Sequence, residues 1–326
     1  MTASVKNKKR LDITKKLAAL VSFNAFRYYM LIIIGYIVLY PLLYMLSTAL
    51  KSDKALLDAS FAWLPRYITS ERFKDAFETL NFWSALRRTL SLQVVSALIE
   101  VFVCSVIAYG FYCYARFNFK GKKVAMLFLI LSLLIPTQMY SLSLSVNYRQ
   151  VDLLGIFGMI YRLTGTDLRL NLYNTNWTFW LPSIFGVGIR SGIIIYIYIQ
   201  FFSGLPYELE DAAYVDGAGP IRTFLSIALP SSGVVIVTVS VLSVIWHWNE
   251  TQLASLCFLN DDWPLSVAVY NIAQTYQQKG IWLGSAPAAP AYVFACCLLF
   301  IIIPLVLYLL LQRKFVKSID RVGITG

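Results

Sequence analysis

Apolar residues are gathered along this chain in six long runs that are separated by polar segments. A helix needs about 20 predominantly apolar residues to cross the ~30 Å hydrocarbon core of a bilayer. The runs cover residues 28–50, 89–112, 125–145, 180–202, 231–248 and 288–311. Because a spanning segment must satisfy its backbone hydrogen bonds internally, each run is expected to be a helix. The pattern predicts an all-α integral membrane protein with six transmembrane helices, the third of them kinked at Pro136.

The basic residues predict the orientation of these helices, since Lys and Arg collect in cytoplasmic loops and tails. They are concentrated in residues 1–27, in the short loop RFNFKGKK at 116–123 and in residues 312–326. In a six-helix protein these three segments lie on the same face, so we expect both termini to be cytoplasmic. Residues 1–27 show no cleavable signal pattern, and the first run is therefore expected to stay as an anchor.

Composition supports the membrane class and disfavours several others. Of 326 residues, 58% are hydrophobic and 14% are charged, whereas soluble domains carry about 45–50% apolar and about 25% charged residues. The net charge of +11 is spread between the apolar runs, which disfavours nucleic acid as a partner. The chain has one histidine, His247, and five cysteines without metal-ligand spacing. We therefore expect no metal and no cofactor in this chain.

The segment GLPYELEDAAYVDGAGPIRTFLSIALP, residues 204–230, breaks the basic trend of the cytoplasmic face. Its acids are Glu208, Glu210, Asp211 and Asp216, against the single base Arg222. Pro206 is tolerated in the first turn of a helix. The positive end of the helix dipole lies at the same turn and stabilises the nearby acids. Gly217 and Gly219 interrupt that helix, Pro220 begins a second one and Pro230 ends it. The segment is therefore predicted to be a helix, a tight turn and a helix at the membrane surface.

Both predicted helices place residues at i, i+3, i+4 and i+7. In the first helix these are Leu209, Ala212, Ala213 and Asp216, and in the second they are Ile221, Phe224, Leu225 and Ala228. A short helix pair is marginal on its own. It must either pack on its own bundle or dock into a partner, and the residues alone leave both alternatives open.

This segment resembles the coupling loop of ABC importer permeases. The family pattern is Glu-Ala-Ala, three residues, Gly, nine residues and Ile-x-Leu-Pro. The matching residues are Asp211, Ala212, Ala213, Gly217, Ile227, Leu229 and Pro230, with Glu208 and Asp216 beside them. Asp211 stands where the family has Glu, a change that keeps the charge.

Three further motifs resemble the carbohydrate branch of that family, and within it the second permease of maltose-type importers. They are LLIPTQ at 133–138, WHWNE at 246–250 and the closing LQRKFVKSIDRVGITG at 311–326. Ser318 replaces the first glycine of the family's tail, and Ile324 and Thr325 also depart from it. The resemblance covers residues 85–326, and residues 162–177 look like an insertion relative to the family.

The resemblance implies a type I permease fold and a set of partners. A homologous second permease would complete the path, an extracytoplasmic solute-binding protein would deliver a saccharide, and two ATP-binding subunits would hold ATP and Mg. The 204–230 loop would dock on one of those subunits, and the tail would reach them through Gln312, Arg313 and Gly326. This chain lacks a GxxxxGK[ST] phosphate loop, so it is not expected to be an enzyme. The setting implied is a bacterial plasma membrane, with lipid around the helices and no nucleic acid.

The same reading divides the chain into four parts. Residues 1–27 form a basic cytoplasmic tail, and residues 28–84 form the first transmembrane helix with an extracytoplasmic loop. Residues 85–311 form the permease core of five helices, including the coupling loop, and residues 312–326 form a cytoplasmic tail.

Several residues in the apolar runs are candidates for the substrate path. They are Glu100, Arg190, Tyr196, Tyr198, Trp246 and Trp248. Ionisable groups at membrane depth usually face the bundle interior or a water-filled path. Glu100 and Arg190 would therefore line the path, pair with each other to lock the bundle, or lie at a watery margin. The aromatic residues would stack on sugar faces or pack against lipid.

Two other functions stay open from the sequence. One is an importer of the same kind for a solute that is not a carbohydrate, because the coupling loop does not select the solute. The other is a self-sufficient secondary transporter or channel, which would need neither an ATPase nor an acidic docking loop.

Overall fold

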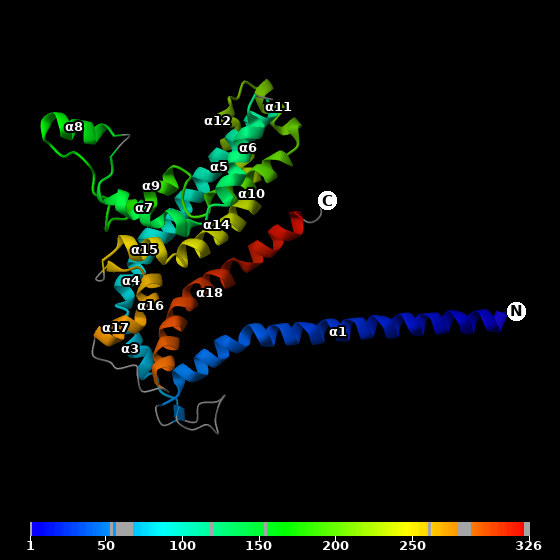
Figure 1. Ribbon diagram of the computed structural model, residues 1–326. Coiled ribbons are helices and arrows are strands. Elements are labelled where there is room, and N and C mark those ends of the chain that lie inside the picture. Colours follow the sequence, from blue (N-terminus) through cyan, green and yellow to red (C-terminus); the bar gives the residue numbers. More distant parts are fainter. Residues whose placement is uncertain are drawn as a thin grey trace. The chain divides into compact units, whose positions relative to one another are not determined.

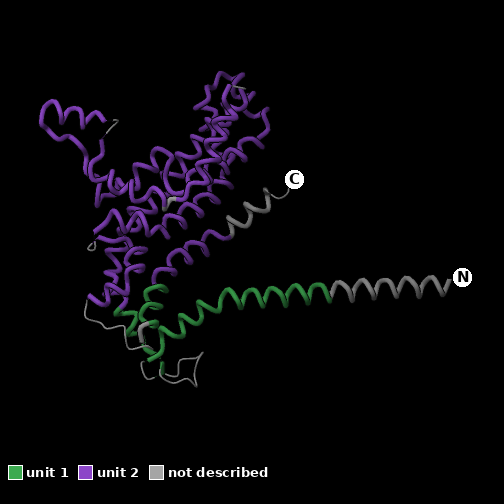
Figure 2. Tube along the Cα trace, in the orientation of Figure 1, with its two compact units in different colours: residues 1–75, 283–298 green, residues 76–282, 299–326 purple. Residues whose placement is uncertain are grey.

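The computed structural model describes residues 2–52, 55–56, 68–117, 120–152, 155–259, 262–278 and 288–322 (Figure 1). Within these ranges the elements are helices, and two isolated antiparallel bridges join Lys51 to Ile68 and Val151 to Leu170. The all-α membrane class expected from the sequence is confirmed. The chain divides into two compact units, which Figure 2 draws in green and purple.

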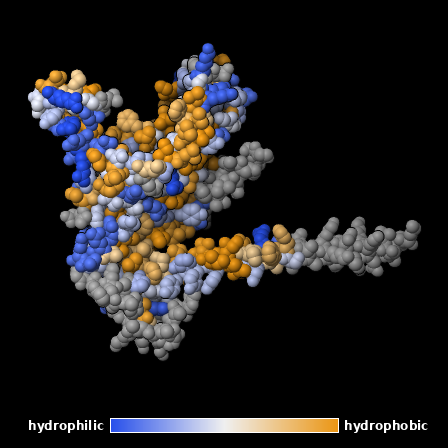
Figure 3. Space-filling view, viewed as in Figure 1, coloured by the Kyte–Doolittle hydropathy of each residue, from blue (hydrophilic) through white to orange (hydrophobic). Residues whose placement is uncertain are grey.

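The first unit, Met1–Asp75 with Leu283–Leu298, is dominated by α1 (Thr2–Leu50), a single helix of 49 residues. Its part Ser22–Leu50 is long and apolar enough to cross a membrane. Side chains such as Ile32 and Ile37 are exposed along it, and apolar surface is visible on the coloured part of this helix in Figure 3. A helix that exposes apolar side chains along its length suits a lipid surrounding.

The second unit, Ala76–Trp282 with Leu299–Gly326, contains the helical core. Here α4 (Phe82–Thr89), the π-turn η1 (Leu90–Val94) and α5 (Val95–Arg116) form one continuous candidate span, Phe82–Arg116. Around α5 pack α9 (Trp177–Ile184), α10 (Ser191–Ser203) and α14 (Gly233–Trp248). Small and aromatic side chains fill the centre, among them Cys104, Ala108, Tyr198 and Val239, all fully buried. The second span is thus the axis on which the fourth and fifth are assembled.

Two of the six runs are not the continuous helices that the pattern predicts. The third run divides into α6 (Lys122–Leu133) and α7 (Thr137–Arg149). Pro136 adopts an extended conformation between them (φ −69°, ψ 140°), so it breaks the helix instead of kinking it.

The fourth run divides into α9 and α10, because residues 185–190 are not helical. Gly186 (φ 67°) and Arg190 (φ 58°) adopt the left-handed conformation, which a right-handed helix cannot accommodate. The other runs are helical: 28–50 in α1, 89–112 in the Phe82–Arg116 span, 231–248 largely in α14 and 288–311 in α18 (Ala288–Val322).

Length and composition give three candidate spans among the described residues: Ser22–Leu50, Phe82–Arg116 and Pro290–Gln312. Counting two strongly bent helix pairs as one span each raises that number to five. Six spans therefore stay a prediction.

Short helices occupy the connections between the runs. They are α3 (Glu71–Thr79), α8 (Ile156–Thr164), α15 (Gln252–Cys257), α16 (Leu265–Tyr270) and α17 (Ile272–Gln278). In the stretch 162–177, Arg169 bonds to Asp167 (2.6 Å) and to Gln150 (3.0 Å). The contact with Gln150 and the bridge between Val151 and Leu170 hold the stretch close to the end of α7.

We expect Gly186→Ala to lower the apparent Tm of the purified protein in detergent. The left-handed backbone costs an L-residue about 1–2 kcal/mol, and a Cβ here would also collide with the tip of the partly buried Ile107 side chain of α5. Overpacking of that kind adds about 1–3 kcal/mol.

The matched control is Gly165→Ala, which has a similar φ of 73° but open space around the missing Cβ. We expect the Gly186 variant to melt several degrees below the Gly165 variant. Equal melting temperatures for the two would contradict the packing of the break against α5.

Candidate functional site

The segment between the fourth and fifth runs has the predicted form. α11 (Tyr207–Val215) is followed by a turn, then by α12 (Pro220–Thr223), the π-turn η2 (Phe224–Ala228) and α13 (Leu229–Ser231). Gly217 lies in the turn with φ 80°, and Pro220 is the first residue of the second helix, as expected. We call residues 204–231 the coupling segment.

Two details of that prediction are wrong. Pro206 is extended (φ −59°, ψ 127°) and precedes the first turn of α11 instead of lying in it. Pro230 is not the last residue of the second helix, which continues one residue further to Ser231, where the chain bends toward α14. α10 and α11 are bent by 78° with respect to each other, and so are Pro220–Ser231 and α14. The coupling segment thus turns sharply away from both membrane helices to which it is joined (Figure 1).

The faces of the coupling segment divide between the bundle and the exterior. Phe224 and Ala228 are buried in the core around α5, which confirms half of the predicted second stripe. The other half is exposed, with Ile221 at 77% and Leu225 at 53%. The segment therefore packs on its own bundle and also leaves apolar side chains uncovered.

The uncovered side of the coupling segment is apolar as well as acidic. Its large exposed apolar residues are Tyr207, Leu209, Val215, Ile221 and Leu225. The predicted residues Glu208, Asp211, Ala212 and Asp216 are exposed too, whereas Ala213, Ile227 and Leu229 are half-buried. Gly219, Pro220, Ile221, Arg222, Leu225 and Ser226 line a shallow depression on this side. Exposed apolar groups rimmed by charges are typical of a docking surface.

Sequence reasoning missed Glu210, the acid that is buried in this segment. Only 1% of it is exposed, and it accepts hydrogen bonds from the hydroxyls of Tyr109 (3.2 Å) and Tyr112 (3.0 Å) and pairs with Arg116. One signal was present in the sequence. Tyr109, Tyr112 and Arg116 are spaced to lie on one face of α5 and so form a polar patch at its end.

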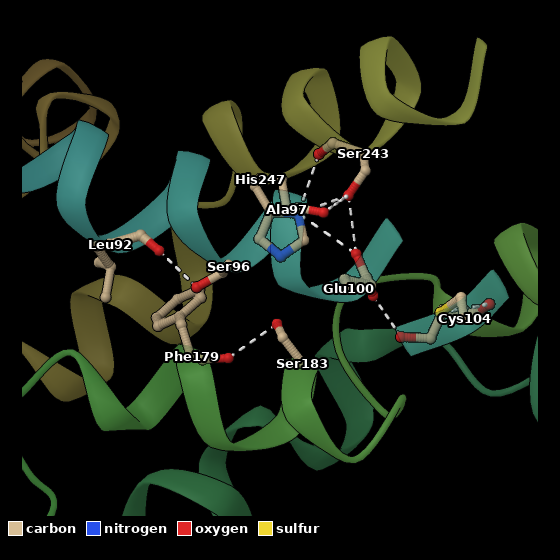
Figure 4. A network of polar contacts seen from close by, with 10 residues as sticks. Leu92, Ser96, Ala97, Glu100, Cys104, Phe179, Ser183, Ser243 and His247 are labelled. Atoms are coloured by element: carbon tan, nitrogen blue, oxygen red, sulfur yellow. Dashed lines mark hydrogen bonds and ion pairs between the residues drawn. The ribbon is translucent and has the colours of Figure 1, made fainter. Parts of the chain in front are cut away.

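A second buried acid, Glu100 of α5, lies in the middle of the bundle (Figure 4). Its carboxylate accepts hydrogen bonds from Ser191 on α10 and from Ser243 on α14 (2.9 Å). His247 Nδ1 lies 3.7 Å from the carboxylate and 3.0 Å from the Ser243 carbonyl oxygen. A Cβ on Gly188 would lie 2.6 Å from Glu100 Oε1, so only glycine leaves room for the carboxylate. Glu100 on α5 therefore joins its own helix to α10 and α14. Its partners are Ser191 and Ser243, and the predicted pair with Arg190 is not formed.

Arg190 instead lies beside Trp246, with its guanidinium carbon 5.1 Å from the centre of a Trp246 ring. The two residues line a hollow of about 200 Å³ together with Ile189, Asn249, Glu250, Thr251 and Gln252. Burial raises the pKa of the Glu250 carboxyl, and the hydrogen bond from the Leu253 amide (2.8 Å) acts in the opposite direction. An aromatic face, a cation, two side-chain amides and one carboxyl group meet here. They could bind a polar, ring-shaped solute.

The other candidate residues are distributed differently. Tyr198 is fully buried and stacks on Phe202, and Trp248 is 2% exposed and packs on Phe300. Tyr196 is exposed. Gln312 is half-buried, whereas the side chain of Arg313 and the whole of Gly326 lie outside the described residues. Of the six path candidates, Arg190 and Trp246 come together in one hollow.

Within the described residues, His, Cys, Asp and Glu form no group of three that could hold a metal ion. The candidate functional surfaces are the coupling segment and the hollow at Arg190.

A helical membrane protein in which a sharply bent, acidic helix pair joins two packed spans has the architecture of an ABC importer permease subunit. The chain belongs to the family of binding-protein-dependent transport system inner membrane components, whose model matches residues 105–321. It is accordingly a multi-pass inner membrane component of a transporter.

The chain is also similar to individual proteins over most of its length. The trehalose transport system permease protein SugB of Mycobacterium tuberculosis (strain CDC 1551 / Oshkosh) is 26% identical over 298 residues, 90% of this chain and 95% of that protein. The maltodextrin transport system permease protein MdxG of Bacillus subtilis (strain 168) is 23% identical over 303 residues, 92% of this chain and 95% of that protein.

One solved structure has the same fold. It is the crystal structure of a bacterial ABC transporter involved in the import of the acidic polysaccharide alginate. The TM-score is 0.64 at 17% identity, covering 90% of this chain and 96% of that chain. At this identity the likeness establishes the fold alone, and it confirms the permease fold that the sequence resemblance implied.

We expect Glu100→Leu to destabilise the protein more than Glu100→Gln. Leucine removes the acceptor of the Ser191 and Ser243 hydroxyls, and a buried polar group without a partner costs about 1–3 kcal/mol. Glutamine keeps one acceptor oxygen and nearly the same volume. The apparent Tm in detergent measures the difference.

The control for this prediction is Glu208→Leu at an exposed position of α11, which should leave the Tm nearly unchanged. A Glu100→Leu variant as stable as the glutamine variant would show that the hydrogen bonds of Glu100 to Ser191 and Ser243 do not hold the three helices together.

Proposed function

We propose that this chain is one of two permease subunits of an ATP-driven bacterial importer of sugars or oligosaccharides. A homologous permease would complete the path, two ATP-binding subunits would hold ATP and Mg on the cytoplasmic side, and an extracytoplasmic binding protein would deliver the solute. Both termini of this chain would be cytoplasmic. The observation that carries the proposal is the exposed apolar and acidic side of the coupling segment.

The coupling segment is suited to transmit a force. Residues 204–206 join α11 directly to α10, and Ser232 alone separates α13 from α14. A partner that docks on Leu209, Ile221 and Leu225 would therefore pull on both the fourth and the fifth span. The exposed carboxylates of Glu208 and Asp216 would meet basic groups of that partner. The tail residues Gln312, Arg313 and Gly326 are a second proposed contact with the ATP-binding subunits.

The hollow beside Arg190 is the proposed contact for saccharide. The Trp246 ring offers an apolar face on which a sugar ring can stack, and Arg190 supplies several N–H donors in a fixed plane. Asn249 and Gln252 add amide donors and acceptors that suit hydroxyl groups. The trehalose and maltodextrin systems of the two relatives support a carbohydrate over another solute. Glu100, Tyr196, Tyr198 and Trp248 stay predicted path residues.

The experiment that tests the function uses the whole complex in liposomes. The chain is purified with its companion permease, ATP-binding subunits and binding protein, and ATP hydrolysis and uptake are measured. The panel holds trehalose, maltodextrins, uronic-acid oligosaccharides and amino acids. We expect at least one saccharide to stimulate hydrolysis and to be imported only with nucleotide. Uptake by this chain alone without nucleotide would favour a secondary transporter, and stimulation by amino acids alone would favour another solute.

We expect Arg190→Met to reduce uptake of the stimulating saccharide about tenfold, because a hydrogen bond to a charged group contributes about 1.5–3 kcal/mol. Trp246→Ala should reduce uptake to a similar degree, since it removes the stacking face. Arg169→Met is the control, because Arg169 lies outside the hollow and bonds to Asp167 and Gln150. Wild-type uptake rates for both hollow variants would remove this surface from the transport path.

A further inference from the structure

The cytoplasmic end of α5 holds the coupling segment through a cluster of charged and aromatic side chains. Glu210 on α11 is buried there, within reach of the Tyr109 and Tyr112 hydroxyls of α5. Arg116, the last residue of α5, pairs with the same carboxylate. A buried carboxylate needs partners for its charge and lone pairs, and all three of these come from the second span.

Arg116 divides its guanidinium between two acids of the coupling segment. Nη1 binds Glu210, and Nη2 lies 2.5 Å from Asp211 Oδ1. The guanidinium also lies over the rings of Tyr207 and Tyr214, with its carbon 4.9 Å and 5.9 Å from the two ring centres. Its planar fork and its aromatic contacts fix its orientation more tightly than a lysine ammonium could. Arg116 thereby contacts α11 along its length, from Tyr207 to Tyr214.

The aromatic rings around this cluster extend the connection to the neighbouring helices. The Tyr109 ring packs on Phe202 at the end of α10 and on Phe224 of η2. The distances between the ring centres are 5.5 Å and 5.2 Å. One residue of α5 therefore contacts the segment that enters the coupling region and the segment that leaves it. The chain itself links α11 to α10 only through residues 204–206, where the direction changes by 78°. Such a bend can act as a hinge unless other contacts brace it.

We infer that Arg116 and Glu210 are positioning residues that fix α11 to the second span, so that a displacement of α11 moves α5 together with α10 and α14. We call this pair, with Tyr109 and Tyr112, the α5 clamp. The inference rests on the proposed docking of the coupling segment on an ATP-binding subunit. It adds a direct route for the motion, from α11 to α5, beside the chain connections to α10 and α14.

The charges of the α5 clamp also present Asp211 to the exterior. One guanidinium faces two carboxylates, so the cluster keeps a net negative charge when both acids are ionised. Glu210 is enclosed, whereas the Asp211 side chain is 63% exposed, and the remaining negative charge is therefore accessible at Asp211. The clamp holds this carboxylate in a defined position for a cationic group of a docking partner.

The test compares uptake with ATP hydrolysis in the reconstituted complex that carries Arg116→Met. We expect uptake per ATP hydrolysed to fall about tenfold relative to the wild-type complex. Arg116→Lys should lie between the two, because an ammonium cannot bind both acids and stack on both rings. Tyr112→Phe is the mild control, since it removes one hydrogen bond to Glu210 and keeps the ring.

If the Arg116→Met complex does not assemble, Glu210→Gln decides. The amide keeps the size of the side chain and an acceptor for a tyrosine hydroxyl, but it removes the charge that Arg116 binds, so uptake per ATP hydrolysed should fall. The inference is overturned if Arg116→Met behaves like the wild type, if uptake and hydrolysis fall in parallel, or, where Arg116→Met does not assemble, if Glu210→Gln keeps the wild-type uptake per ATP. A wild-type complex without nucleotide-driven uptake would instead refute the proposed function, so the two failures are distinguishable.

Discussion

A bilayer offers no hydrogen-bond partner to an open backbone group, and this constraint governs where the chain can interrupt its helices. The helix is interrupted at residues 185–190, and this interruption lies against α5. Side chains of α5 therefore surround the non-helical backbone where lipid would otherwise lie. Glu100 reaches the first turn of α10 through Ser191, beside backbone N–H groups that carry partial positive charge. Gly188 allows that approach because it has no Cβ. The buried acid and the broken helix thus stabilise each other.

Polar side chains in the bundle fall into two physical kinds. Glu100 has hydroxyl donors from two other spans, and its satisfied carboxylate fixes their spacing. Arg190 lies at a hollow, over the face of Trp246 and beside Glu250. A satisfied buried group contributes to the architecture, whereas a cation at a polar hollow is available to a solute. Both are ionisable residues within apolar runs of the sequence, so the contacts are what separates them.

Much of the fold followed from local sequence signals. The apolar runs predicted helices in the correct places, and Gly217 and Pro220 predicted the turn of the coupling segment, because these signals depend on single residues and their neighbours. The breaks of the third and fourth runs could not be read from hydropathy, which averages over a window and does not register a left-handed Arg190. Glu210 resembled the exposed acids around it in the sequence. Its burial depends on Tyr109, Tyr112 and Arg116, about a hundred residues away along the chain.

The two acids bound by Arg116 differ in whether a second cation can reach them. Glu210 has two tyrosine hydroxyls besides the guanidinium and is shielded from water, so an outside cation has no access to it. Asp211 is largely exposed and shares Arg116 with Glu210, so a cation of a partner can compete for it at little cost in desolvation. Binding at Asp211 would leave the guanidinium held by Glu210 and by the rings of Tyr207 and Tyr214. The contact with a partner and the brace to the second span are therefore compatible in one cluster, which a single acid at this position would not allow.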